Sequence, residues 1–198
     1  MKVSTMLITF LFLTSLSTKA QELEYSFNES YEISIPTKLN ISSSNSDINV
    51  LTHDKNTIEV YYVVKKNGEL LKVNKERLTQ ITNKQYRLDI QNSANELTLE
   101  VINIPKKGFT KSEDTIIIDF IVYVPKQTNC DLLSSDGNIL LQGLNSNQKC
   151  ITNDGDIELT NLKGNVIAKT SDGDIIIDNV IGKVHSQTKD GQIIKTKK

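Results

Sequence analysis

The sequence has no tryptophan, three prolines, two histidines and two arginines among its 198 residues. The scarcity of proline and tryptophan is typical of stacked short strands. His53 and His185 have no third ligand at a metal-binding spacing, so we expect both on the surface. A polysaccharide-cleaving enzyme needs a cleft lined by convergent acids or bases. Without tryptophan to stack a sugar, and with Arg77 and Arg87 alone, we expect no catalytic site and no cofactor.

A strong charge of either sign is also lacking, since the full chain carries a net charge of −1. Residues 1–20 combine Lys2, an apolar run and small residues before Gln21, which predicts a secretory signal peptide too short to span a membrane. Its removal takes away Lys2 and Lys19 and no acidic residue, which leaves 21 basic and 24 acidic side chains and a net charge of −3. This mild charge argues against nucleic acid as a partner. We expect residues 21–198 to form a single domain.

The feature that the sequence does have is a repeat in its last third. An Asp-Gly dipeptide, followed by Asn, Asp or Gln and then Ile, recurs every 18 residues, and its aspartates are Asp136, Asp154, Asp172 and Asp190. A fixed short period indicates stacked units that bury their apolar faces against one another. Each repeat contains two runs in which apolar and polar residues alternate, bounded by Asp-Gly, Asn or Gly, and this pattern predicts two strands per repeat. The predicted fold class is therefore all-β, a parallel β-solenoid with 18-residue coils over residues 130–198.

The N-terminal part has strand-like patterns without a regular period. Alternating runs around residues 58–64, 86–90 and 97–101 predict strands, and residues 115–124 predict a strand covered on both faces. Residues 46–50 repeat the later pattern without its glycine, so we interpret them as an irregular early coil followed by long excursions. Residues 70–81 predict one short helix, because no Gly or Pro interrupts them.

These residues carry a resemblance to a known family. Val-Pro-Lys at residues 124–126 and the Ser-Asp-Gly-Asn-Ile run with its successors resemble the bacterial "putative adhesin" β-strand-repeat family of exported and envelope proteins. The likeness covers roughly residues 39–198. It implies a structural repeat with no catalytic residues, on a protein of the periplasm, the cell surface or the medium.

The repeated Asp-Gly turns hold the candidate site residues. The four repeat aspartates would stack along one edge, where oxygen-rich ladders are able to hold calcium. The alternative is that each aspartate closes its own turn. We favour the alternative because the repeats lack the second glycine of calcium-binding β-rolls. The following glycines are expected at positive φ, which glycine reaches without steric cost: Gly137, Gly155, Gly173 and Gly191.

Cys130 and Cys150 are the only cysteines. Both are expected to point inward, but in different columns of the stack. Diagonal neighbours lie at the limit of disulfide geometry, so we predict two buried free thiols rather than a bridge.

One outward column is apolar at three of its four positions, which are Leu140, Glu158, Ile176 and Ile194. It would serve as a partner surface, or the N-terminal half would fold over it, and we favour the second case.

The sequence thus predicts an exported, non-enzymatic adhesin or envelope-interaction module with an envelope, matrix or glycan ligand. A periplasmic accessory or sensing module remains the alternative, and a carbohydrate-active enzyme is less favoured.

Overall fold

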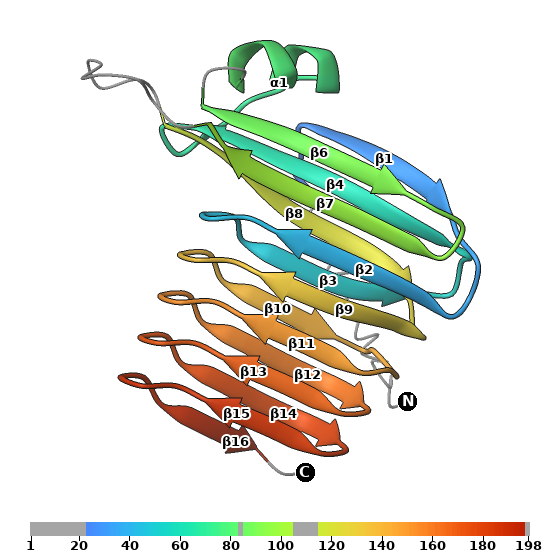
Figure 1. Ribbon diagram of the computed structural model, residues 1–198, viewed down its shortest axis with the longest axis vertical. Coiled ribbons are helices and arrows are strands. Elements are labelled where there is room, and N and C mark those ends of the chain that lie inside the picture. Colours follow the sequence, from blue (N-terminus) through green and yellow to red (C-terminus); the bar gives the residue numbers. More distant parts are fainter. Residues whose placement is uncertain (1–22, 83–84, 105–114, 197–198) are drawn as a thin grey trace, which may run out of the picture.

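The computed structural model describes residues 23–82, 85–104 and 115–196. These residues form sixteen strands and one helix in two facing sheets (Figure 1). The predicted signal peptide at residues 1–20 lies outside the described residues. The elements are β1 (Phe27–Glu32), β2 (Thr37–Ser42), β3 (Ile48–His53), β4 (Thr57–Lys66), β5 (Glu69–Leu70), α1 (Lys75–Thr82), β6 (Tyr86–Asn92), β7 (Glu96–Asn103), β8 (Ile116–Pro125), β9 (Thr128–Leu133), β10 (Ile139–Gln142), β11 (Gln148–Ile151), β12 (Ile157–Lys163), β13 (Val166–Lys169), β14 (Ile175–Ile181), β15 (Val184–Gln187) and β16 (Ile193–Thr196).

Sheet A contains nine strands in the order β1-β4-β8-β3-β10-β12-β14-β16, with β5 beside β4. Sheet B contains seven strands in the order β15-β13-β11-β9-β2-β7-β6. Each C-terminal repeat gives one strand to each sheet, and all of these strands pair in parallel with a register shift of one repeat. Ile139, for example, lies beside Ile157, and Ile157 lies beside Ile175. The 18-residue period is therefore the spacing between stacked strand pairs.

Residues 46–50 occupy the place predicted for an early coil, because Ile48 aligns in parallel with Ile139. The excursion that follows does not form irregular coils, however, and the prediction of a parallel solenoid throughout is wrong for this region. Strands β1, β4, β5 and β6 pair antiparallel with their neighbours, so both sheets are mixed. One of these pairs, β4 with β5, has a local cause, since Asn67 and Gly68 both adopt positive φ between the two strands, as a tight hairpin turn requires.

The helix predicted for residues 70–81 is shorter than expected. Residues 69–70 form β5, and α1 begins after Asn74, whose side chain accepts the backbone N–H of Arg77 at 2.9 Å as an N-cap. Leu78 is the buried apolar side chain of the helix. In Figure 1, α1 lies at the end of the stack opposite to the C-terminal strands. Within the described residues, no helix is long and apolar enough to cross a membrane.

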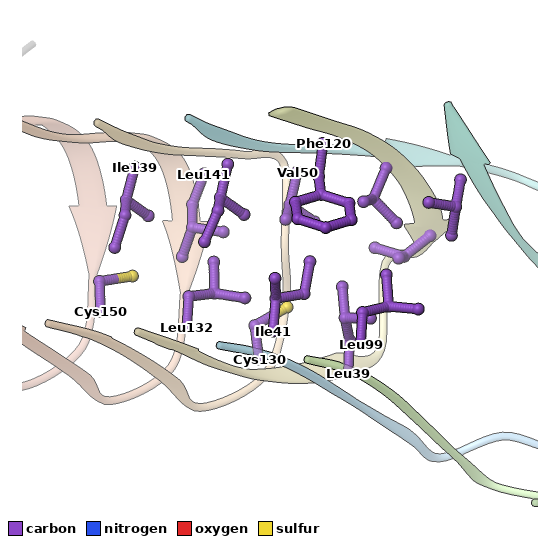
Figure 2. Packing of buried hydrophobic residues seen from close by; sticks show 14 of the residues in the cluster. Leu39, Ile41, Val50, Leu99, Phe120, Cys130, Leu132, Ile139, Leu141 and Cys150 are labelled. Carbon is purple, nitrogen blue, oxygen red and sulfur yellow. The ribbon is translucent and has the colours of Figure 1, made fainter. Parts of the chain in front are cut away.

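The space between the two sheets is filled by one continuous cluster of buried side chains (Figure 2). Ile139, Leu141, Val50 and Phe120 enter it from sheet A, and they face side chains of sheet B such as Leu132. Because alternate side chains of each strand fill this cluster, the intervening ones form the two outer faces of the molecule. Any binding surface of the strands must lie on those faces or at the turns.

Candidate binding surface

The four repeat aspartates all lie on exposed turns. The described residues contain no group of three or more histidine, cysteine or acidic side chains arranged to hold a metal ion. The nearest partner that the structure shows for Asp190 is Lys189, whose Nζ lies 3.4 Å from the carboxylate at an exposed site. This arrangement favours a purely structural turn.

We predict that the melting temperature of the protein will be the same with millimolar calcium and with a chelator. A cation that binds only the folded state would raise it. Differential scanning fluorimetry or calorimetry measures this directly. A calcium-dependent rise of more than about 3 °C, roughly what 1 kcal/mol produces in a domain of this size, would contradict the prediction.

The turn is closed by the hydroxyl two residues before the aspartate, not by the aspartate itself. The Oγ1 of Thr170 accepts the N–H of Gly173 at 3.2 Å, and lies 2.9 Å from the carbonyl oxygen of Asn153 and 3.0 Å from that of Gly155. One buried hydroxyl therefore fixes its own turn and ties it to the preceding repeat. Ser134 and Thr188 have the same two roles, and the hydroxyl of Thr152 likewise ties its turn to the carbonyl oxygens of Ser135 and Gly137 in the preceding repeat.

The glycines after the aspartates are required for a reason other than the predicted one. Their φ angles are not positive; the positive-φ residues of the repeats are at other turns, such as Gly143, Asn161 and Asn179. A Cβ at Gly155 would instead overlap the backbone carbonyl of Gly137 in the preceding repeat, and Gly137, Gly173 and Gly191 are equally close to the backbone stacked before them. Glycine thus permits close stacking of the turns.

A ladder of side-chain hydrogen bonds runs beside these turns. The Oδ1 of Asn138 accepts the N–H of Asp156 at 2.8 Å, the Oδ1 of Asp156 accepts that of Asp174 at 2.8 Å, and Asp174 accepts that of Gln192 at 2.7 Å. Sequence reasoning missed this role, although the Asn or Asp two residues after each repeat aspartate was visible. The hydrogen bonds of these polar side chains join adjacent repeats and so stabilise the stack.

The two thiols are buried and unpaired, as predicted. Cys150 lies beside Leu132, whereas Cys130 lies beside Gln148, so the cysteines occupy different columns (Figure 2). Burial raises the pKa of both thiols, which disfavours the reactive thiolate.

We therefore predict that a thiol reagent will label neither cysteine in the native protein at pH 8 and both after unfolding in guanidinium. Intact mass with and without reductant should be identical. A mass lower by two hydrogens without reductant would show a bridge and contradict the prediction.

The outer face of sheet A carries a row of aligned side chains, most of them apolar, that runs from β1 to β16. Strand register aligns Tyr61 with Ile121, and Ile176 with Ile194. Leu140 lies between these two pairs. The polar members of this row are Asn28, Asn49 and Glu158. We call Tyr61, Ile121, Leu140, Ile176 and Ile194 the apolar row. The described strands of the N-terminal half do not fold over it, contrary to the favoured prediction, because β1, β4, β8 and β3 extend sheet A edge to edge.

The outer face of sheet B has a different character, with charged side chains paired across neighbouring strands. Lys38 lies 3.3 Å from Glu96, and Lys149 lies 3.0 Å from Asp131. Leu133 and Ile167 are its well-exposed apolar residues. The two outer faces are thus distinguishable, and sheet A offers the more continuous apolar surface.

Aromatic rings gather at the N-terminal end of the sheet A face. The ring of Tyr61 lies 4.9 Å from that of Tyr25 and 5.7 Å from that of Tyr123, edge to face in both cases, and Tyr123 lies 6.4 Å from His53. We call these four residues the aromatic track. His53 is half-buried, with Nε2 2.7 Å from the carbonyl oxygen of Thr57, whereas His185 is exposed on sheet B.

The track ends at an open hollow of about 290 Å³ beside His53. Polar side chains dominate its lining: His53, Asp54, Lys55, Asn56, Lys126, Gln127 and Asn145, together with Ile35 and Pro125. Lys126 donates to Asp54 at 2.8 Å and lowers the pKa of that carboxyl group. Asp54 is therefore held in its ionised form.

Comparison with known proteins gives only distant likenesses. No family model matches the chain, and no curated protein matches it. The crystal structure of a "putative cell adhesion protein" from Clostridium sporogenes ATCC 15579 is similar with 12% identity and a TM-score of 0.42, over 86% of this chain and 99% of that one. A "putative adhesin" from Bacteroides fragilis NCTC 9343 is similar with 14% identity and a TM-score of 0.28, over 86% of this chain and 96% of that one.

Proposed function

We propose that this protein is an exported, non-enzymatic β-solenoid module that binds a component of the cell envelope or matrix through the outer face of sheet A. The observation that carries the proposal is the difference between the two outer faces. Ion pairs occur on both faces, such as Lys65 with Asp119 at 2.7 Å on sheet A and Lys149 with Asp131 at 3.0 Å on sheet B. Sheet A adds the apolar row, interrupted by Asn49 and Glu158, and the aromatic track. Apolar side chains gathered on an outer face among polar ones are typical of an interaction site.

The electrostatics of the hollow favour binding over acid–base catalysis. A general acid or base works best with a pKa near the working pH. The pKa of Asp54 is instead lowered by Lys126, and that of Glu59 nearby is lowered chiefly by a hydrogen bond from Lys55 at 2.6 Å. Both carboxylates are therefore suited to structural ion pairs.

Ile176→Asp is expected to weaken binding to the envelope fraction of the producing cells by about tenfold or more, because it places a charge in the middle of the apolar row. The matched control is Ile167→Asp, which makes the same change on the outer face of sheet B, where Ile167 is 40% exposed. Labelled protein and a sedimentation assay give the affinity, and circular dichroism verifies the fold. If both variants lose binding equally, or if neither loses it, the assignment of binding to the outer face of sheet A is refuted.

Export is tested separately by protease treatment of intact cells together with fractionation. Loss of the protein to protease or its presence in the medium would support a role at the surface. Survival of the protein in the periplasmic fraction would support the accessory-module alternative, and retention in the cytoplasm would refute export altogether.

A further inference from the structure

The aromatic track is an unusual feature for the outside of a sheet. The hydrophobic core beneath it already has its own large side chains, since Tyr62 and Phe120 are fully buried on the inner side of the same strands. Tyr61 and Tyr123 point the other way and are half-buried on the outer face. They therefore contribute a surface rather than core volume.

The rings are held in fixed orientations. The plane of Tyr61 is inclined by 80° to that of Tyr25 and by 78° to that of Tyr123, the edge-to-face packing that aromatic pairs favour. Tyr61 and Tyr123 lie on the adjacent strands β4 and β8, each of which is paired on both sides, and this restricts their movement. A platform fixed before binding loses less side-chain entropy when a ligand arrives.

The charged groups at the hollow balance one another. Lys55 pairs with Glu59 at 2.6 Å, and Lys126 pairs with Asp54 at 2.8 Å. At the other end of the track the Nζ of Lys72 lies 5.9 Å from the centre of the Tyr25 ring and donates to the carbonyl oxygen of Tyr25 at 2.9 Å. The hollow itself therefore offers an ionic ligand no excess of opposite charge. What the hollow offers is uncharged hydrogen-bonding groups, from the side chains of Asn56, Gln127 and Asn145.

His53 belongs to both the aromatic track and the lining of the hollow. Its Nε2 lies 2.7 Å from the carbonyl oxygen of Thr57, which accepts only, so Nε2 carries the proton and donates. Nδ1 of the same ring is an acceptor when the ring is neutral. The ring thus ends the aromatic track and begins the polar hollow.

We propose that the aromatic track and the hollow beside His53 form one extended binding site for a neutral oligosaccharide. The C–H faces of pyranose rings are apolar and pack on aromatic rings, while their hydroxyl groups need both donors and acceptors. A series of rings that leads to uncharged amides supplies both. The track spans β4, β8 and β3, so its length suits several linked sugars rather than a monosaccharide. This inference rests on the proposed function and names the ligand class of the same face.

The test is isothermal titration calorimetry of the purified, processed protein with cellohexaose, chitohexaose and maltohexaose. At least one is expected to bind saturably, and Tyr123→Ala and Tyr25→Ala are each expected to weaken that binding about tenfold. Tyr25 precedes β1, so its replacement leaves the paired strands intact. Tyr123→Phe should recover most of the affinity lost in Tyr123→Ala, because the ring remains. The control His185→Ala alters an exposed ring on sheet B and should bind like the unaltered protein.

The outcomes separate the two proposals. If none of the three oligosaccharides binds but Ile176→Asp still reduces envelope binding, the glycan site is refuted and the binding face stands. If an oligosaccharide binds equally well to the alanine variants, the site is misplaced. If neither oligosaccharide nor envelope binding is observed, both proposals fail.

Discussion

Replacing Gly155 with alanine is expected to destabilise the protein by more than about 4 kcal/mol, a large share of the roughly 5–15 kcal/mol that stabilises a folded domain. The added Cβ would meet the carbonyl group of Gly137 and the N–H of Asn138. All of these are backbone atoms of a neighbouring repeat that is fixed on both sides by parallel pairing. Neither partner is able to move without breaking the ladder, so the overlap cannot be relieved locally.

Urea denaturation followed by circular dichroism measures this effect, and two variants control it. Asp154→Ala changes the adjacent, exposed residue and should cost less than about 0.5 kcal/mol. Gly191→Ala creates the same overlap with Gly173, but in the turn that precedes β16, the edge strand of sheet A. Because the last repeat is able to detach alone, we expect a loss of only about 1 kcal/mol there. A Gly155→Ala protein as stable as Asp154→Ala would contradict the stacking explanation.

The second large effect is expected for Thr170→Val, which should lower the free energy of unfolding by about 2–3 kcal/mol. Valine has a similar shape, but it removes the acceptor of the Gly173 N–H and the donor to the carbonyl oxygens of Asn153 and Gly155. The site is buried, with Thr170 only 7% exposed, so water does not readily replace these bonds.

Thr170→Ser is the matched control, because serine keeps the hydroxyl and loses only a methyl group. We expect it to be within about 1 kcal/mol of the unaltered protein. Chemical denaturation of both variants under the same conditions gives the comparison. If serine, which keeps the hydroxyl, destabilises the protein as much as valine does, the hydrogen bonds of the hydroxyl do not account for the stability of the turn.

Much of the stack follows from the sequence because its cause is periodic. The 18-residue spacing fixes which residues become neighbours, so it correctly predicts the alignment of Ile139 with Ile157 and the separate columns of the two cysteines. The hydrophobic alternation likewise indicates which side chains enter the core. In such a stack the neighbours of a residue are the equivalent residues of the adjacent repeats, so they are identified directly from the period.

The features that the sequence did not predict depend on contacts between segments that are not copies of one another. The Asn-Gly pair at residues 67–68 was a visible hairpin signal, yet which strands would then pair antiparallel was not. The aromatic track joins Tyr61 and Tyr123, which are far apart in the chain and meet through the pairing of β4 with β8. The role of Gly155 was also hidden, because a sequence does not distinguish a glycine needed for its φ angle from one needed for a close approach.

Because the register of the parallel strands is constant, the length of the stack is able to change by whole repeats. Each repeat offers the next the same hydrogen bonds and the same apolar columns, from β10 to β14. Duplicating or deleting a block of 18 residues would therefore move the C-terminal end by one strand spacing, about 4.8 Å, and leave the aromatic track unchanged. An insertion of 17 or 19 residues would instead reverse the inward and outward faces of the strand whose register it shifts. The length of the stack is thus able to change by whole repeats without altering the surface at its other end.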